Sequence, residues 1–266
     1  MIDDIDELGR LADANLAASW TSLGSNAGGV IRASDGAVFV ATGIPVAFFN
    51  GVFVTAPVSD PERVIAEAVS FMAERDVPWL IWVRDGVDDD LLAVGRGAGL
   101  SDAGGPLGMT LATIGDIPPP PSELEISAIV DGGAIETFRD VTARGFDMPR
   151  DVVDGFVTDS ILDDPACTML IGSVDGIAVS CSMVVVSGRT AGVYNVGTPA
   201  EHRRRGYGAA LTWAAVEHGA RRGCSHSTLQ ASELGAPVYR SMGFVEVGRY
   251  VQLEGPPSSG RHEPHA

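Results

Sequence analysis

The sequence predicts a mixed α+β protein made of two similar units in tandem, and three observations lead to that prediction. Short apolar runs of strand length alternate with helical patterns along a chain of 266 residues, 45% of them hydrophobic. The order of these segments is similar in the two halves of the chain. A proline run at residues 118–121 separates the halves, and prolines favour an extended, semi-rigid connection. We therefore expect units at residues 1–116 and 123–255, a linker at 117–122 and a disordered tail at 256–266.

The first unit is expected to run helix, two strands, helix, strand, helix, strand. Apolar residues recur at helical spacing from Ile5 to Leu16 and indicate the opening helix. Asp60 followed by Pro61 is typical of a helix start, because Asp caps free backbone N–H groups and Pro suits the first helical position. The expected helices lie at residues 3–23, 60–75 and 91–95, and the expected strands at 37–41, 46–55, 79–83 and 109–112.

The stretch between residues 36 and 59 contains no charged residue and is long enough to cross a bilayer. Gly43, Pro45 and the pair Asn50-Gly51 interrupt it, and its other residues are typical of strands. We therefore expect two buried strands there, and no membrane association.

The second unit is expected to run strand, two helices, three antiparallel strands, helix, strand, helix, strand. Asp175-Gly176 lies between two apolar runs, and this dipeptide favours the two-residue turn of a β-hairpin. The expected strands lie at residues 124–130, 167–174, 177–187, 190–196, 227–230 and 245–253, and the expected helices at 133–144, 150–162, 206–222 and 235–242.

One stretch of the second unit has the pattern of an anion site. The strand expected at residues 190–196 is followed by a charged loop and then by Arg203-x-x-Gly206-x-Gly208, which opens a helix. Glycines let a ligand approach the backbone closely, because they lack a Cβ. The free N–H groups and the positive end of the helix dipole favour a phosphate. The same pattern also occurs in plain loop-to-helix turns, and three arginines in a row also occur as a solvated charge run.

Together with Tyr239-x-x-x-Gly243-Phe244 downstream, this motif makes residues 190–250 resemble the acetyl-CoA site of the GNAT N-acetyltransferase superfamily. The resemblance implies the GNAT fold and acetyl-CoA as co-substrate. The first unit has a similar element order but lacks the motif between residues 50 and 62. We therefore expect a degenerate first GNAT-like domain and an intact second one.

The resemblance also assigns roles to residues. It implies that Tyr239 protonates the departing CoA thiolate, a role that suits a phenol at neutral pH, although a core tyrosine would give the same pattern. Ser232 stands where many members carry an Asn near the cofactor. Asn195 is expected to touch the thioester. The pantetheine arm and the pyrophosphate would be bound by Val196, Gly197, Thr198, Arg203, Arg204, Arg205, Gly206, Tyr207, Gly208 and Ala209.

The base and the amine acceptor stay open. Glu201, Glu233 and Tyr194 are candidate bases, although each also fits a surface or packing role. Phe146, Met148 and Phe156 fit either an amine pocket or the core, and the first domain is a candidate wall of that pocket. The acceptor is expected to be a small-molecule or peptide amine.

Composition excludes several other classes. The net charge is −17, and all 18 basic residues are Arg. This balance argues against nucleic acid and permits a cationic amine. No His/Cys cluster has metal spacing, so no metal is expected. Three cysteines without short spacing and an acidic N-terminus favour a cytoplasmic protein.

The oligomeric state stays open, and a homodimer fits the sequence. Two other functions also remain open alongside acetyl transfer: a non-catalytic acyl-CoA-binding module, and a transferase for a longer acyl group.

Overall fold

The first half of the chain forms a small sheet with helices on both faces. The structure is a computed structural model and describes residues 4–255. The elements of this half are α1 (Ile5–Asn26), β1 (Val30–Ser34), β2 (Ala37–Ala41), the 3-10 turn η1 (Ala47–Phe49), β3 (Asn50–Val54), α2 (Pro61–Ala73), β4 (Leu80–Arg84), α3 (Asp89–Gly97), β5 (Ser101–Gly104) and β6 (Leu107–Leu111).

The second half begins after the proline run and follows the predicted order, with 3-10 turns added. Its elements are β7 (Glu125–Ala128), α4 (Gly132–Phe146), α5 (Arg150–Phe156), η2 (Asp159–Asp163), β8 (Cys167–Val174), β9 (Ile177–Ser187), β10 (Thr190–Gly197), η3 (Ala200–His202), α6 (Tyr207–Arg221), β11 (His226–Ala231), α7 (Ala236–Ser241) and β12 (Val245–Glu254). The hairpin predicted at Asp175-Gly176 joins β8 to β9, which pair antiparallel.

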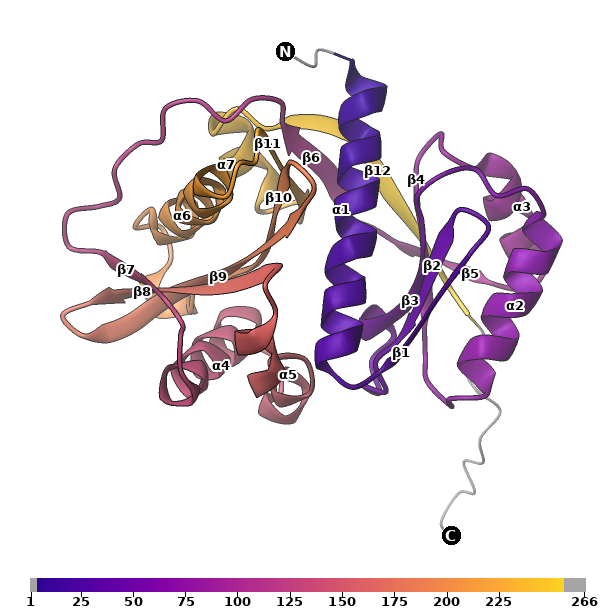
Figure 1. Ribbon diagram of the computed structural model, residues 1–266, viewed down its shortest axis with the longest axis horizontal. Coiled ribbons are helices and arrows are strands. Elements are labelled where there is room, and N and C mark those ends of the chain that lie inside the picture. Colours follow the sequence, from indigo (N-terminus) through magenta and orange to yellow (C-terminus); the bar gives the residue numbers. More distant parts are fainter. Residues whose placement is uncertain (1–3, 256–266) are drawn as a thin grey trace, which may run out of the picture.

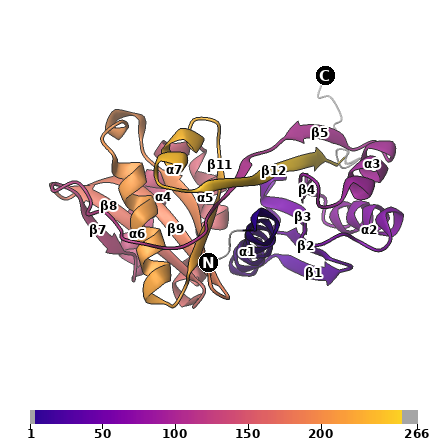
Figure 2. The ribbon, with the colours of Figure 1, turned by 90° about the horizontal axis from the view of Figure 1, so that it is seen from above.

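The two halves share one sheet because they exchange strands. Its order is β1-β2-β3-β4-β12-β6-β11-β10-β9-β8-β7, with β5 beside β12. Strand β6 of the first half pairs with β11 and β12 of the second. The far end of β12 pairs in turn with β4 of the first half. Figure 2 shows β12 running from the α6 and α7 side across to α3. The division into two tandem units at residues 117–122 remains a proposal. Strands from each side of this division pair with strands from the other side.

Helix α1 lies between the first and second halves of the chain in Figure 1, and it contacts strands of both halves. Its Asn15 is fully buried and donates from Nδ2 to the carbonyls of Val185, at 3.1 Å, and Thr190, at 3.3 Å, in the second half. A Cβ at Gly192 would lie 1.8 Å from Asn15 Oδ1. Glycine on β10 therefore permits this close approach of α1 to the second half.

A buried ion pair fixes the other side of α1. Asp13 is 2% exposed and accepts from Arg84 Nε with both carboxylate oxygens, at 3.0 and 3.1 Å. Arg84 Nη1 donates to the carbonyl of Val247 at 3.0 Å, and the Tyr250 hydroxyl donates to Asp13 at 2.9 Å. This network ties α1, β4 and β12 together with its polar groups paired, as burial of charge requires.

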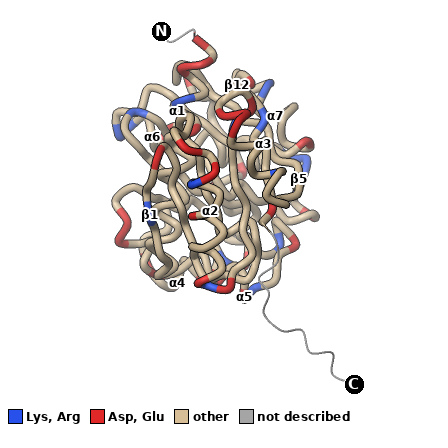
Figure 3. The backbone as a smooth tube through the Cα atoms, turned by 90° about the vertical axis from the view of Figure 1, so that its right-hand side faces the viewer, with Lys and Arg blue, Asp and Glu red and all other residues tan. Residues whose placement is uncertain are grey.

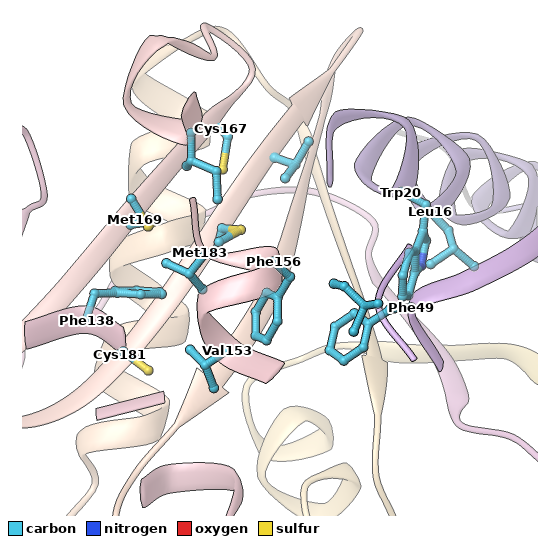
Figure 4. Packing of buried hydrophobic residues seen from close by; sticks show 14 of the residues in the cluster. Leu16, Trp20, Phe49, Phe138, Val153, Phe156, Cys167, Met169, Cys181 and Met183 are labelled. Atoms are coloured by element: carbon cyan, nitrogen blue, oxygen red, sulfur yellow. The ribbon is translucent and has the colours of Figure 1, made fainter. Parts of the chain in front are cut away.

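Three large apolar clusters and a small one, made by Leu8, Ala12 and Val247, form the core of the described residues. One packs α2 and α3 on the first half of the sheet, and another packs α6 and α7 on the second half. The third runs across the junction and includes α1, α4 and α5. Figure 4 shows its aromatic contact between the halves, where Phe49 stacks on Phe156 with ring centroids 4.7 Å apart.

Several expectations differ from the structure. β1 and β5 were not predicted, and the strand expected at residues 46–55 begins as the turn η1. The helix expected at 150–162 breaks after Phe156 into η2. The tail expected at 256–266 lies outside the described residues. The uncharged stretch at 36–59 contains strands β2 and β3, and none of the helices within residues 4–255 is both long and apolar enough to span a membrane.

Charged residues lie scattered over the backbone. Figure 3 shows acidic and basic positions interspersed on the side that carries α2 and α3. Many of the arginines pair with nearby carboxylates, as in the contact between Arg63 and Asp35. The acidic net charge is therefore spread along the chain, a pattern that suits solubility.

Candidate active site

The site begins where two parallel strands separate. β10 pairs with β11 only from Thr190 to Gly192. Beyond that point β10 keeps β9 on one side, and its other edge is free to its end at Gly197. β11 meanwhile stays paired with β6 as far as Ala231. The separation therefore leaves a free strand edge facing a gap, and such an edge can pair with an extended ligand.

A β-bulge on β10 lies beside this gap. The register with β9 shifts between Tyr194 and Gly197, and Asn195 takes a positive φ of 51°. The Asn195 side chain donates from Nδ2 to Thr142 Oγ1 at 2.9 Å, which fixes the bulge to helix α4. Bulges change where strand groups point, so this one alters the direction of the amides that follow Asn195.

The start of α6 has the geometry of an anion site. Gly206 is the N-cap, with φ of 82°, and Arg204 also has a positive φ, of 62°. No hydrogen-bond partner within residues 4–255 is found for the backbone N–H groups of residues 204–209. Such consecutive free amides at a helix N-terminus bind phosphate groups. The sequence motif therefore lies at a helix start with free amides, here called the cradle, and phosphate binding there stays a prediction.

The arginines of the motif have different surroundings. Arg203 donates from Nε to the carbonyl of Thr198 at 2.8 Å and from Nη2 to that of Gly145 at 3.0 Å. It therefore positions the loop between β10 and α6 through backbone carbonyls. Arg204 and Arg205 are exposed beside the free amides. Their charge is thus available to an anion bound there.

The other predicted cofactor residues connect the cradle to the gap. Gly208 is close to both parts, because a Cβ there would lie 3.5 Å from Thr198 Oγ1 and 3.9 Å from Val196. Thr198 is held by the Ser180 hydroxyl at 2.8 Å. Tyr207 is buried, so its backbone rather than its ring is available to a ligand. Ser232 is exposed and caps the turn before α7 by accepting from the Gly235 N–H.

Tyr239 lies on α7 at the edge of a cavity. Its ring packs edge-on against Phe244, with centroids 6.1 Å apart. Burial raises the pKa of the Tyr239 phenol above its usual value of 10, an effect that the Thr212 hydroxyl opposes. The phenol therefore keeps its proton at neutral pH, as a general acid must.

The cavity joins the gap to the junction between the halves. Its volume is about 780 Å³, within the usual range for a small-molecule site. The second half contributes the end of β10, the end of β11 and Tyr239. The first half contributes α1, η1 and Trp82 of β4. The first half therefore forms one wall of the cavity, and its part in an acceptor pocket stays a prediction.

The three candidate bases differ in their surroundings. Glu201 is exposed and ion-paired with Arg144; a hydrogen bond from its own backbone and the Arg144 contact lower its pKa. The Tyr194 hydroxyl donates to Asn15 Oδ1 at 2.6 Å, and burial raises its pKa. Glu233 is exposed and lines the cavity. Of these three, Glu233 combines a carboxylate with access to the cavity.

Sequence reasoning found part of the cavity. Phe146, Met148 and Phe156, for which a pocket and the core were both open, line it. Trp20 and Phe48 were missed as lining residues, since they belong to the half without the motif. The sequence gives no signal for them, because aromatic residues are about as frequent in the second half as in the first.

Ligand groups for a metal are not gathered in the described part of the chain. Within residues 4–255 no cluster of three or more His, Cys, Asp or Glu side chains has a geometry that could hold an ion. Cys167, Cys181 and Cys224 are free and buried. Burial raises the pKa of Cys167 to about 12 and that of Cys181 to about 11, so both thiols stay protonated at neutral pH.

Comparison with known proteins points to one family. Residues 168–247 match the model of the acetyltransferase (GNAT) domain. No curated protein sequence matches the chain. A GCN5-related N-acetyltransferase from Kribbella flavida superimposes with a TM-score of 0.70 at 17% identity, over 93% of this chain and 96% of that one.

Two further solved structures have the same arrangement. A GCN5-related N-acetyltransferase from Sphaerobacter thermophilus has a TM-score of 0.60 at 17% identity, over 83% of this chain and 76% of that one. A tandem GNAT protein from the clavulanic acid biosynthesis pathway has a TM-score of 0.57 at 16% identity, over 86% and 79%. These likenesses establish the GNAT fold for this chain.

Proposed function

Because this chain carries an acetyltransferase domain of the GNAT type, we propose that it moves an acetyl group from acetyl-CoA to a primary amine of a small molecule or peptide. The single observation that carries the proposal is the run of free amides at residues 204–209, next to the free edge of β10. A pyrophosphate and an extended pantetheine arm require these two features side by side.

Acetyl-CoA fits the residues present. In this proposal the pyrophosphate rests on the backbone N–H groups of Arg204, Arg205, Gly206, Tyr207, Gly208 and Ala209, and the side chains of Arg204 and Arg205 add positive charge. The arm pairs with Val196, Gly197 and Thr198. Arg203 acts on the site through the loop that it holds, and Ser232 lies at the cavity wall.

Transfer is proposed to be direct, without an acyl-enzyme. The amine nitrogen attacks the thioester carbonyl carbon and forms the new N–C bond of a tetrahedral intermediate, which then collapses as the C–S bond breaks. Tyr239 gives its proton to the departing thiolate and regains one from solvent. An amide at the end of β10, after the bulge, stabilises the oxyanion of the tetrahedral intermediate. The proton lost by the amine leaves through Glu233 or through water.

Catalysis in this scheme depends mainly on positioning. The thioester and amine meet in the cavity between the halves, and aligned reactants gain rate without covalent help from the protein. The buried, free cysteines are compatible with a reducing, cytoplasmic site of action, which forms part of the same proposal.

The test is calorimetric titration with acetyl-CoA, followed by thiol release with a panel of amines. Gly208→Glu should abolish binding, because its carboxylate would stand beside the cradle and the arm. Gly208→Ala is the matched control: a Cβ there meets its neighbours at ordinary contact distance, so binding should persist. Wild-type protein that does not bind acetyl-CoA would contradict the proposal. Binding without turnover of any amine would favour a non-catalytic acyl-CoA-binding module.

A further inference from the structure

We propose that the amine acceptor is a small monoamine whose body is apolar and of aromatic size, and that the first half of the chain recognises this body. This inference rests on the proposed acetyl transfer and names the substrate class of the same site. Two observations lead to it: the aromatic wall of the cavity and the placement of charge around it.

Aromatic rings from both halves form the wall of the cavity. Phe48 is its centre in the first half, with ring centroids 5.3 Å from Trp20 and 5.5 Å from Trp82. Phe48 and Phe146 are 47% and 44% exposed, whereas the deeper rings are buried. The Trp and Phe side chains that line the cavity are Trp20, Phe48, Phe49, Trp82, Phe146 and Phe156, and two tyrosines line it as well.

The half-exposed rings have a consequence for the ligand. Phe48 and Phe146 present apolar surface that the protein itself leaves uncovered, and they come from different halves. A ligand body seated between them would remove that surface from water, which is favourable in proportion to its apolar area. A flat ring also suits the spacing of aromatic pairs.

Charge is confined to the margin of the cavity. Among the described residues that line it, the charged side chains are Glu233 and Arg249, and both are exposed. Arg249 also donates to the carbonyl of Gly105 at 2.7 Å. A second ammonium group deep in the cavity would lack a carboxylate partner, and burying an unpaired charge is costly. The cavity therefore disfavours polycationic amines, although the chain as a whole is acidic.

The test compares three amines on wild-type protein with acetyl-CoA: 2-(4-methoxyphenyl)ethylamine, 2-phenylethylamine and 1,4-diaminobutane. Burial of a ring predicts a kcat/KM about 10- to 100-fold higher for the aromatic amines than for the diamine. Equal or better use of the diamine would overturn the proposal. If acetyl-CoA binds but no amine turns over, calorimetry with the CoA complex decides: selective binding of the aromatic amines supports the inference, and its absence overturns it.

Matched variants locate the recognition. Phe48→Asp puts a carboxylate into the wall at a half-exposed position, where folding should tolerate it. It should lower kcat/KM for the aromatic amines about tenfold and narrow their advantage over the diamine. Ile177→Asp is the control, because Ile177 is 61% exposed in the β8–β9 hairpin, outside the cavity wall. Equal effects of the two changes would contradict recognition by the first half.

The apolar wall has one competing occupant, a long acyl chain on CoA. Octanoyl-CoA and acetyl-CoA are therefore titrated in parallel. Similar affinities support the cavity as the acceptor's site, whereas octanoyl-CoA binding ten times more tightly would assign the wall to the acyl group and overturn the proposal. If wild-type protein does not bind acetyl-CoA at all, the result contradicts the proposed acetyl transfer itself and is thereby distinguished from failure of the acceptor proposal.

Discussion

The chain contains two strand–turn–helix junctions of the same topology, β3 to α2 in the first half and β10 to α6 in the second. In each, a strand pairs antiparallel with the strand before it and parallel with the strand after the helix. In the first half, parallel pairing covers Gly51–Phe53 and stops one residue before the strand ends at Val54. In the second half, five residues of β10 extend beyond it.

The helix starts differ even more. At α2 the Asp60 side chain accepts from the N–H of Arg63 at 3.0 Å, and Asp35 accepts from those of Ser59, at 3.0 Å, and Asp60, at 3.2 Å. These backbone hydrogen bonds, the one from Ser59 above all, lower the pKa of Asp35. At α6 the corresponding amides are free, and glycine and arginine stand where α2 has carboxylates. The first half thus occupies its own anion site with acidic side chains.

In the first half, aromatic rings fill the space that corresponds to the gap beside β10 in the second half. Phe53 on β3 stacks on Trp20, with centroids 4.9 Å apart, and lies 5.8 Å from Trp82 on β4. The same topology therefore gives a free strand edge with free amides in one half and a packed wall in the other. The fold alone does not decide which occurs; the capping residues and the side chains at the strand ends do.

Removal of the buried carboxylate that joins the halves should have the largest effect on stability. Asp13→Asn leaves Arg84 buried without a counter-charge, which typically costs about 3–5 kcal/mol of unfolding free energy. Denaturant unfolding measures this loss. Asp102→Asn is the control, since its pair with Arg96 is exposed, and it should leave the midpoint unchanged. Equal shifts for both would contradict a structural role for the Asp13 network.

Loss of the Tyr239 hydroxyl should lower the rate of acetyl transfer without changing the binding of acetyl-CoA. Tyr239→Phe removes the proton donor while keeping the ring against Phe244, so we expect kcat to fall by about 100-fold or more. The dissociation constant for acetyl-CoA should not change. Steady-state kinetics and calorimetry on the same preparation check both. A kcat within twofold of wild type would show that another group protonates the thiolate.

The pH profile gives an independent check on Tyr239. An acid acts while protonated, and the pKa of Tyr239 is raised above 10, so its protonated form persists below that value. The rate of wild-type protein should therefore rise as the amine loses its proton and should not decline between about pH 7 and pH 9. A descending limb centred in that interval would argue against an unionised Tyr239 as the acid.

The α2 cap should show a smaller effect, on stability only. Asp60→Ala removes the side chain that accepts from Arg63 N–H, and loss of such a cap costs about 1 kcal/mol. Thermal unfolding should detect this change, while acetyl-CoA affinity should stay at the wild-type value. Weaker acetyl-CoA binding in this variant would assign a ligand role to the first half's helix start.

The sequence predicted the local features well, because local patterns determine them. The bounds of β8 and β9 match the prediction, as apolar runs flanking Asp175-Gly176 define them. The helix start at Gly206 followed from glycine spacing. β1 and β5 were missed: β5 is exposed throughout, without the alternation of a half-buried strand.

The strand exchange and the cavity could not be predicted in the same way. β6 and β12 pair across more than 130 residues of sequence, as Leu107 does with Arg249, and periodicity carries no information about partners at that separation. The cavity wall at Phe48 depends on where α1 and η1 lie against the second half. That placement follows from tertiary contacts such as Asn15 with Val185.

The stoichiometry of acetyl-CoA binding tests the difference between the two junctions most directly. Calorimetric titration of wild-type protein should give one site per chain, since the amides at α2 are taken by Asp60 and Asp35 and those at α6 are free. Gly208→Glu should reduce that number to zero. Two sites per chain, or one site that survives in Gly208→Glu, would contradict the assignment of acetyl-CoA to the second half.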